Sequence, residues 1–348
     1  MDPVTHVLTG VAISRSGLNR KTALSTLTLA IAAEIPDSDL IWRFKGPVSE
    51  FAHHRGFSHT FLGAPIMAAL ALGIVYLIAG RSRNAKAAAG DSETPQQPPR
   101  WRLLYLYALL GVLSHLLLDF TNNYGLRPLD PFNYRWFAWD IVFIADPIIM
   151  ASLLFALIAP WFSGLISGEI GARRPQYRGR GSAITALVCI VLVWWVRDFS
   201  HRRAITLLNQ QTYQDQEPVR VSASPNPFNP FSWLGIVETQ NFFVTLRVDT
   251  LAGAVDPQRS AVTLYKPEET PITLAAKKSP LGRAFLDWAR YPYVETEVLE
   301  PPQSGFIVRM HDLRFAYPWL NTKPLSMSVH LDAKLNVVSQ SVGKSEQR

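Results

Sequence analysis

The chain has 348 residues, of which 48% are hydrophobic and only 18% charged, and its formal net charge is +7. Because about 25% charged residues is usual for soluble proteins, this composition favours a protein with membrane-embedded segments, and the cations fit either a membrane or nucleic acid. The single cysteine, Cys189, excludes an internal disulfide and any metal site built from cysteines.

Two short apolar helices are predicted at the start of the chain, over residues 3–13 and 22–35, joined by the basic turn SRSGLNRK. At about 1.5 Å per residue, each is shorter than the roughly 30 Å hydrocarbon core of a bilayer. We therefore expect a hairpin that packs inside a helical bundle or enters the membrane part way. Such a hairpin returns His6 and Asp37 to the same level.

Four longer apolar runs follow, and they approach or reach the length of a membrane-spanning helix. About 17 to 25 residues are needed to span a bilayer, so two of the runs qualify and two are marginal. A soluble helical core is the competing interpretation, but the run lengths, the low charge and the flanking cations together favour a membrane. The runs cover residues 61–80, 103–118, 147–168 and 181–196.

Lysine and arginine concentrate in two connections between these runs, residues 81–102 and 169–180, whereas the other connections are acidic. Since positive loops stay in the cytoplasm, the pattern predicts a multi-pass protein of the bacterial inner (cytoplasmic) membrane. His59, His115 and Asp119 then lie on the outer (periplasmic) side, together with the C-terminal part of the chain. Membrane topology accounts for the net charge, so we expect no nucleic-acid partner.

The remaining segments divide the chain into two parts. Residues 84–99 have the composition of a linker, and no structure is predicted for them. Beyond residue 214, β-branched and aromatic residues alternate with polar ones, which is typical of strands, and SPLGRAFLDWARY predicts one helix capped by Ser279. The predicted fold class is an all-α membrane helical bundle over residues 1–200, followed by a β-rich (α+β) extramembrane domain over residues 215–348.

Imidazoles and carboxylates concentrate in the first third of the chain. His115 and Asp119 are four residues apart, so they share one helix face, where both can ligate a metal or the carboxylate can orient the imidazole. An ordinary polar pair inside the bundle is the alternative, although ionisable groups within membrane helices are costly and usually functional. Two further segments, EIPDSD and HHRGFSHT, add aspartates and histidines.

These segments are expected to meet at one depth. The hairpin returns Asp37 beside His6, His59 begins one apolar helix, and the HxxxD pair ends another. Neutral imidazole and carboxylate without thiolate suit Zn²⁺, Mn²⁺ or Fe²⁺. The sequence therefore predicts a metal site at the outer surface of the membrane.

On these motifs the chain resembles the YdjM-type family of inner-membrane metal-dependent hydrolases. The hallmark His-Arg-Gly-x-Thr-His-Ser segment of that family matches residues 54–60, with serine and threonine exchanged. Its PDxD and HxxxD motifs match residues 36–39 and 115–119, and the family's start is matched as well. The matched starting residues are Asp2, His6, Thr9 and Gly10.

A more distant similarity is to zinc-dependent phospholipases C and single-strand nucleases, which are all-helical enzymes that cleave phosphodiesters at a zinc cluster. The chain lacks their later histidine ligands after HxxxD, where only Asp140 and Asp146 could substitute. One or two metal ions are therefore expected rather than three.

The resemblance implies roles for eight residues. It implies five metal ligands: His6, Asp37, His59, His115 and Asp119. It also implies three residues that assist them: His54 as a ligand or general base, Arg55 as a clamp for an anionic oxygen or a lipid-headgroup contact, and Asp39 as a hydrogen-bond partner of the ligands. Zn²⁺ is the expected cofactor, as one or two ions, with Mn²⁺ or Fe²⁺ as alternatives.

A divalent ion with an open position lowers the pKa of bound water toward 7 and polarises the bond under attack. The expected function is a membrane-bound metal-dependent hydrolase acting on a phosphoester, with a membrane lipid or lipid-linked substrate, while amide or carboxylic ester hydrolysis stays open. The alternative is a non-enzymatic membrane scaffold with a structural metal and a partner-binding β domain. A transporter would need polar groups through the membrane, which residues 61–80 and 181–196 almost lack.

Overall fold

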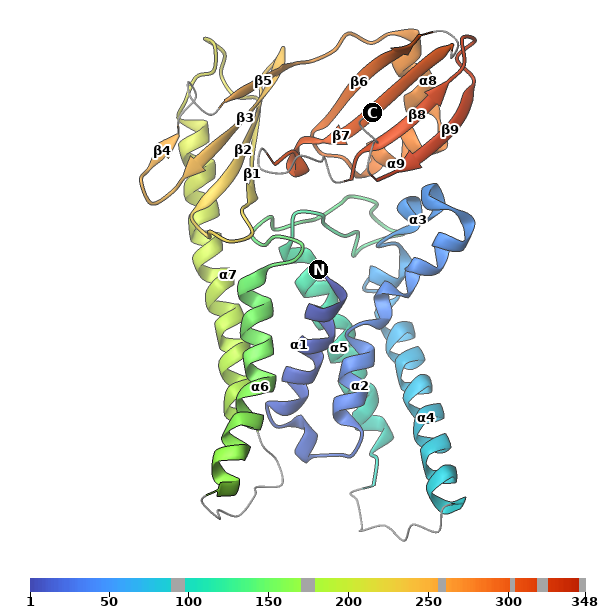
Figure 1. Cartoon of the computed structure of the whole chain (residues 1–348), viewed down its shortest axis with the longest axis vertical. Coiled ribbons are helices and arrows are strands. Elements are labelled where there is room, and N and C mark those ends of the chain that lie inside the picture. The colour runs from blue at the N-terminus through green and yellow to red at the C-terminus, as the bar shows by residue number, and fades with distance from the viewer. Residues whose placement is uncertain (89–97, 170–178, 256–260, 301–303, 318–324, 344–348) are drawn as a thin grey trace. The chain divides into compact units, whose positions relative to one another are not determined.

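A computed structural model describes residues 1–88, 98–169, 179–255, 261–300, 304–317 and 325–343 of the chain. The chain divides into two compact units, one made of residues 1–38 and 55–197 and the other of residues 39–54 and 198–348. The first unit is helical, and the second contains all the strands that Figure 1 labels. This arrangement confirms the expected fold class.

The first unit is a bundle whose helices run up and down beside one another (Figure 1). Three short 3₁₀ helices connect or follow them: η1 (Leu18–Arg20), η2 (Ile35–Lys45) and η3 (Phe57–His59). The α-helices of the bundle are α1 (Pro3–Arg15), α2 (Ser25–Ala32), α4 (Ala64–Ala88), α5 (Trp101–Thr121), α6 (Pro147–Glu169) and α7 (Arg180–Asn209).

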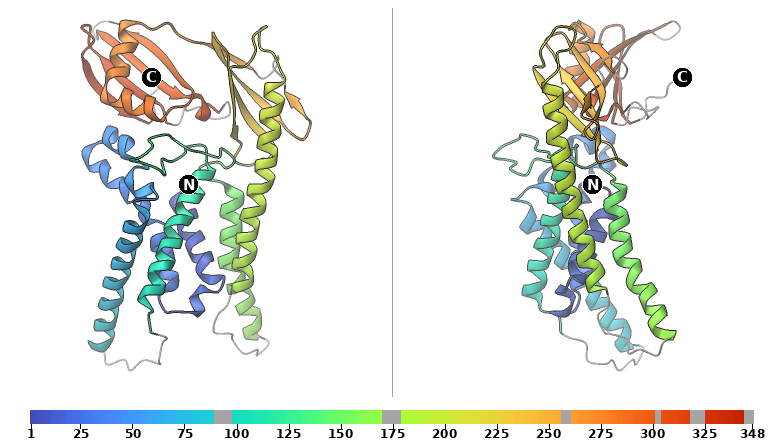
Figure 2. Two further views of the ribbon diagram at one scale, coloured as in Figure 1. Left: turned by 180° about the vertical axis from the view of Figure 1, so that it is seen from behind. Right: turned by 90° about the vertical axis from the view of Figure 1, so that its left-hand side faces the viewer.

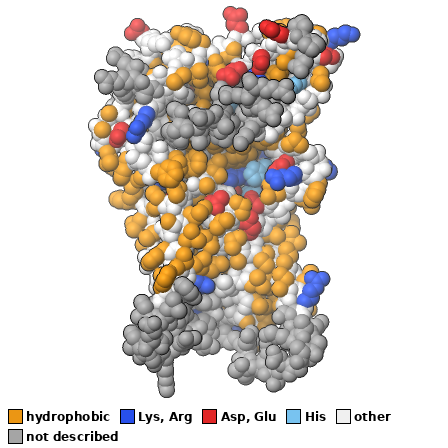
Figure 3. Space-filling view, viewed as in Figure 1, with side chains coloured by type: hydrophobic (Ala, Val, Ile, Leu, Met, Phe, Trp, Pro, Cys, Tyr) orange, Lys and Arg blue, Asp and Glu red, His pale blue; other side chains and the backbone are white. Residues whose placement is uncertain are grey.

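Within the described residues, three of these helices are long and apolar enough to cross a membrane: Ala64–Arg81 within α4, and the whole of α5 and α7. In α6 the apolar stretch is the shorter Pro147–Pro160. Over the helices of this unit, the surface visible in Figure 3 is largely hydrophobic. Helix α4 continues to Ala88, into the segment predicted to be an unstructured linker, and residues 89–97 of that segment lie outside the described residues.

The helices α1 and α2 form the expected hairpin, whose turn lies at the level where α5 and α7 begin. The Arg180 Nε donates to the carbonyl oxygen of Ser16 at 3.0 Å, and the backbone N–H of Arg100 donates to Thr22 Oγ1 at 2.8 Å. The open end of the hairpin therefore lies toward the end of α5. That is the end at which His115 and Asp119 are placed.

Two glycines allow α2 to pack closely between α1 and α5. A Cβ atom on Gly10 would lie 2.3 Å from the carbonyl oxygen of Leu29, and one on Gly111 would lie 2.8 Å from the Ala32 Cβ. Small residues at helix contacts are typical of membrane bundles, because they let backbones approach. Close packing of α2 fixes where the chain after it, including Asp37, comes out beside α5.

In the part of the chain that the structure describes, the second unit contains two antiparallel sheets. One has the order β1-β2-β3-β4, with β5 also paired to β3, and the other has the order β6-β7-β8-β9. The strands of the first sheet are β1 (Arg220–Pro225), β2 (Ser232–Glu238), β3 (Phe242–Asp249), β4 (Ala254–Val255) and β5 (Val262–Tyr265). Those of the second are β6 (Pro292–Leu299), β7 (Gly305–Asp312), β8 (Met327–Leu331) and β9 (Val337–Val342), and η4 (Leu313–Phe315) follows β7.

Three further helices belong to the second unit. Helix α9 (Pro280–Trp288) has Ser279 as its N-cap, as predicted, whereas α8 (Pro271–Lys278) was not expected from the sequence, and neither was β1. Helix α3 (Pro47–His53) groups with this unit because Phe51 packs edge-on against Trp288, with ring centroids 5.6 Å apart.

The final turns of α7 also belong to the second unit. Ala204 and Leu208 are fully buried against the first sheet, in a core that includes Trp233. The indole N–H of Trp233 donates to the Ser200 hydroxyl at 2.8 Å. Residues beyond the fourth predicted apolar run thus continue the helix and anchor the sheet.

Candidate metal centre

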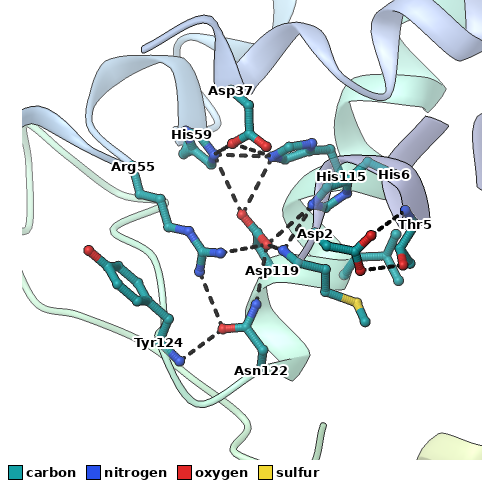
Figure 4. Close-up of polar contacts among 12 residues, drawn as sticks. Asp2, Thr5, His6, Asp37, Arg55, His59, His115, Asp119, Asn122 and Tyr124 are labelled. Atoms are coloured by element: carbon teal, nitrogen blue, oxygen red, sulfur yellow. Dashed lines mark hydrogen bonds and ion pairs between the residues drawn. The ribbon is translucent and has the colours of Figure 1, made fainter. Parts of the chain in front are cut away.

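Four side chains from three separate segments gather at the end of α5 (Figure 4). One ligand atom from each lies within 4.8 Å of all the others. The two histidines and one aspartate are fully buried, and the other aspartate is partly buried. The four residues, called the metal cluster below, are Asp37 in η2, His59 in η3, and His115 and Asp119 in α5.

Five of the six distances between these ligand atoms are close to the edges of a tetrahedron. The Nε2 atoms of His59 and His115 lie 3.1 Å apart. Asp37 Oδ1 lies 3.3 and 3.6 Å from these two nitrogens, and Asp119 Oδ2 lies 3.5 and 3.4 Å from them, respectively. With metal–ligand distances of about 2.0–2.2 Å, tetrahedral geometry separates the ligands by roughly 3.3–3.6 Å. The residues therefore fit one zinc-like ion.

Each histidine has a partner on its other ring nitrogen. His115 Nδ1 lies 2.7 Å from the carbonyl oxygen of Ala33, which requires that Nδ1 carries the proton and donates it. His59 Nδ1 lies 3.0 Å from the Ser58 hydroxyl. Such contacts orient the ring and direct Nε2 toward a metal.

Asp119 divides its oxygens between two roles. Oδ2 faces the histidines of the metal cluster, whereas Oδ1 accepts from Arg55 Nη2 at 2.8 Å and from Asn122 Nδ2 at 3.2 Å. The α-amino group of Met1 also contacts Oδ1. These donors hold the carboxylate so that one oxygen remains directed at the cluster.

Arg55 is held by protein acceptors on more than one side. Beyond Asp119, its Nη1 donates to the carbonyl oxygen of Gly125 at 2.7 Å, and its guanidinium lies 4.7 Å from the ring centroid of Tyr124. The side chain of Arg55 is 4% exposed. This geometry supports a role in positioning Asp119, beside the predicted role as a clamp for an anionic oxygen.

His6 lies against the metal cluster without being one of its four members. Its ring stacks on that of His115 at a centroid distance of 3.7 Å. Its Nε2 lies 3.4 Å from Asp119 Oδ1 and 2.9 Å from the α-amino nitrogen of Met1. The expected return of His6 to the level of Asp37 is thus observed.

His54 and Asp39 pair with each other instead. The Nδ1 of His54 lies 3.4 Å from Asp39 Oδ1, and both belong to the segment that groups with the second unit. Asp146, considered as a later ligand, caps α6 by accepting from the N–H of Ile149 at 3.1 Å and pairs with Arg197 at 2.7 Å.

Two further polar residues lie near the metal cluster and were not predicted from the sequence. Asn122 follows Asp119 by three residues, and this one-turn spacing was a signal that could have revealed it. Glu34 precedes Asp37 by three residues, and burial together with the Asp37 charge raises the pKa of Glu34 to about 7. For Asp37 burial opposes ionisation, but hydrogen bonds from His115 and His59 outweigh it and lower the pKa of this carboxyl.

Replacing Asn122 by alanine is expected to weaken metal binding about 10- to 100-fold, because one donor that orients Asp119 is lost. Titration of the purified protein with a competing chelator measures this affinity. The matched control is Asn133→Ala, which replaces an exposed asparagine of the same loop whose Oδ1 accepts from the backbone N–H of Arg135 at 2.9 Å. Equal metal affinities of the two variants would contradict the positioning role.

Comparison with known proteins links this site to one of two matched regions. The sequence model of the YdjM inner membrane protein family matches residues 1–204, which include the metal cluster, and that of the YfhP C-terminal alpha/beta plait domain matches residues 271–348. The chain is 26% identical over 352 residues to Uncharacterized protein YfhP of Bacillus subtilis (strain 168), an alignment that covers 99% of this chain and 95% of that protein. No solved structure matches the chain.

Proposed function

Because this chain belongs to the YdjM inner membrane protein family, we propose that it is a membrane-bound hydrolase that uses a metal held by Asp37, His59, His115 and Asp119. The observation that carries the proposal is the set of two imidazoles and two carboxylates, three of them buried and one partly buried, whose ligand atoms lie within 4.8 Å of one another. A divalent ion supplies an acidified water and polarises the ester or phosphoester oxygen. Zn²⁺ is the proposed ion, with Mn²⁺ or Fe²⁺ as alternatives, because the donors are nitrogen and oxygen without sulfur.

The remaining predicted residues take supporting roles in this proposal. His6 is a further ligand, of the same ion or of a second one, since its Nε2 lies 3.4 Å from Asp119 Oδ1. His54 is a further ligand or the general base, with Asp39 as the carboxylate that orients its ring. Arg55 holds Asp119 and adds positive charge where an anionic oxygen develops.

The depth of the metal cluster supports a lipid-borne substrate. His59 lies just before the apolar span of α4, and Asp119 lies within two residues of the end of α5. The ends of spanning helices lie at the membrane–water interface, where the polar groups of lipids are found. A phospholipid or lipid-linked phosphoester is therefore the proposed substrate class.

The test is metal analysis of the detergent-purified protein followed by a hydrolysis screen. The screen contains phospholipid vesicles, a chromogenic phosphodiester and a carboxylic ester, each with metal-loaded and chelator-stripped protein. Metal-dependent turnover of any of these supports the proposal. Absence of turnover by protein that retains its metal would reject it.

A structural metal in a non-enzymatic scaffold is the second candidate. The observation that favours it is that four protein ligand atoms lie within 4.8 Å of one another, since four protein ligands are the number found in closed structural zinc sites. Structural sites are usually rich in cysteine, however, and this cluster contains none. Stoichiometric metal that resists chelators, without turnover, would favour the scaffold.

We further propose that the metal cluster and the second unit lie on the outer side of the membrane. Charge asymmetry supports this orientation, because the cation-rich connections follow the other ends of the spanning helices. In a Cys189→Ala background, an impermeant thiol reagent added to intact cells is expected to label Glu268→Cys but not Lys21→Cys. Both positions are exposed, and Lys21 lies in the hairpin turn. The reverse labelling pattern would overturn the orientation.

A further inference from the structure

Large apolar side chains are exposed on both sides of His59 and in the loop after α5. Soluble surfaces rarely gather such side chains without a binding role. Phe132 is 85% exposed and is the most exposed of them. The set, called the aromatic rim below, contains Phe57, Phe61, Leu62, Leu129, Phe132 and Tyr134.

The two parts of the aromatic rim are joined by the backbone. The N–H of Phe61 donates to the carbonyl oxygen of Pro128 at 2.9 Å, which ties the entry to α4 to the loop after α5. The loop itself projects sideways from the bundle, as the green trace in the right-hand view of Figure 2 shows. The exposed Phe132 and Tyr134 therefore belong to a loop that lies beside the helices.

The aromatic rim continues into a surface that must face lipid. Leu62, Ile66 and Leu70 are spaced by four residues and lie on one face of the chain entering α4, where they are 50%, 56% and 49% exposed. This stripe runs into the apolar span of α4. An exposed stripe on a spanning helix faces acyl chains, and the rim extends that face beyond the end of the span.

The composition of the loop is that of a membrane interface. Arg127 lies over the ring of Trp136 at 4.7 Å. Aromatic rings are enriched where the hydrocarbon meets the headgroups, and arginine there extends its charge to the lipid phosphates.

We propose that the aromatic rim inserts into the headgroup layer of the bilayer and seats the metal cluster there. His59 is fully buried, whereas Phe57 and Phe61, two residues to either side, are half exposed. A metal ligand thus lies one layer of side chains away from the lipid. Resting on the proposed function, this assigns as substrate an amphipathic lipid whose acyl chains stay in the bilayer while its polar bond reaches the metal.

Spin labelling tests the insertion without relying on catalysis. Labels are placed at Phe132→Cys and, as a matched control, at Val338→Cys, an apolar residue on β9 that is 69% exposed. Both variants carry Cys189→Ala and are reconstituted in nanodiscs of phosphatidylcholine and phosphatidylglycerol. Accessibility to oxygen relative to a water-soluble nickel complex is expected to be severalfold higher at position 132. Equal ratios of oxygen to nickel accessibility at the two positions would overturn insertion. A label at position 132 that neither oxygen nor the nickel complex reaches would also overturn it and would indicate a protein contact.

Hydrolysis kinetics test the delivery of substrate. The double variant Phe132→Ser, Tyr134→Ser is expected to lose activity severalfold on phospholipid in vesicles while keeping metal content and activity on a soluble short-chain ester. Equal loss on both substrates would reject delivery through the rim. If the unmodified protein hydrolyses neither substrate, the proposed function fails, whereas the accessibility ratio still decides whether the rim inserts.

Discussion

Alanine in place of His59 is expected to remove the metal from the purified protein and to abolish metal-dependent hydrolysis. The His59 Nε2 lies 3.1 Å from His115 Nε2, 3.3 Å from Asp37 Oδ1 and 3.5 Å from Asp119 Oδ2, so it neighbours every other donor of the metal cluster. Its loss leaves two carboxylates and one imidazole. Since removal of an outer hydrogen-bond partner costs about 10- to 100-fold in affinity, loss of a ligand is expected to cost more.

The measurement is the metal-to-protein ratio after gel filtration, beside the chelator titration used for Asn122. The same motif supplies the control, because His53→Ala removes an exposed histidine whose Nδ1 lies 2.8 Å from the carbonyl oxygen of Ser49. His53→Ala is expected to retain the metal. A His59→Ala protein that is folded and still holds stoichiometric metal would rule out the site as described.

Methionine in place of Arg197 is expected to lower the unfolding free energy by about 3–5 kcal/mol, because it breaks a buried ion pair. The Arg197 Nη2 lies 2.7 Å from Asp146 Oδ2, and both side chains are 0% exposed. Asp146 also caps α6, so the pair joins the start of that helix to α7. Burial raises the pKa of Asp146 even beside Arg197. In the Arg197→Met variant the Asp146 carboxyl would therefore either be protonated or remain as a buried charge without its arginine.

The unfolding midpoint in detergent measures this effect. A carboxyl whose pKa is raised on folding lowers the unfolding free energy as the pH rises through that raised pKa. The loss of unfolding free energy caused by Arg197→Met is therefore expected to be larger at neutral than at acidic pH. The double variant Arg197→Met, Asp146→Asn keeps a side chain that caps α6 but has no charge at position 146. It is expected to regain much of the unfolding free energy that Arg197→Met loses.

The control for this prediction is a surface pair on the same helix. Arg202→Met breaks a contact of 2.9 Å to Asp198, but the Arg202 side chain is 75% exposed. Exposed pairs of this spacing contribute about 0.3–0.5 kcal/mol. Equal destabilisation by Arg197→Met and Arg202→Met would contradict the importance of burial.

The amino-acid sequence by itself determined the features that depend on local pattern. Apolar runs of spanning length are a property of consecutive residues, and three of the four expected runs correspond to helices long enough to cross a membrane. The four-residue spacing of His115 and Asp119 placed them on one face, because a helix turns every 3.6 residues. Period-two alternation likewise indicated the β-rich part, and Ser279 indicated the start of α9.

Local pattern also had limits within single elements. β1 and α8 were missed, although α8 begins with a capping box at Thr270. The apolar content of 84–88 was too low for a spanning run, yet α4 continues through it to Ala88, because a helix that already exists extends at little further cost.

Only the tertiary structure decided which polar groups meet. Asp37 reaches the histidines because Gly10 and Gly111 let α2 pack close to its neighbours, and a contact across helices has no signature in either segment alone. The two oxygens of Asp119 serve the metal cluster and Arg55 separately. The contact with Arg55 joins two residues that are 64 positions apart in the chain. The grouping of residues 39–54 with the second unit follows from packing such as that of Phe51 on Trp288. Helices and strands follow from hydrogen bonds and side-chain period along the chain, whereas a metal centre follows from distances in space between residues that sequence order leaves far apart.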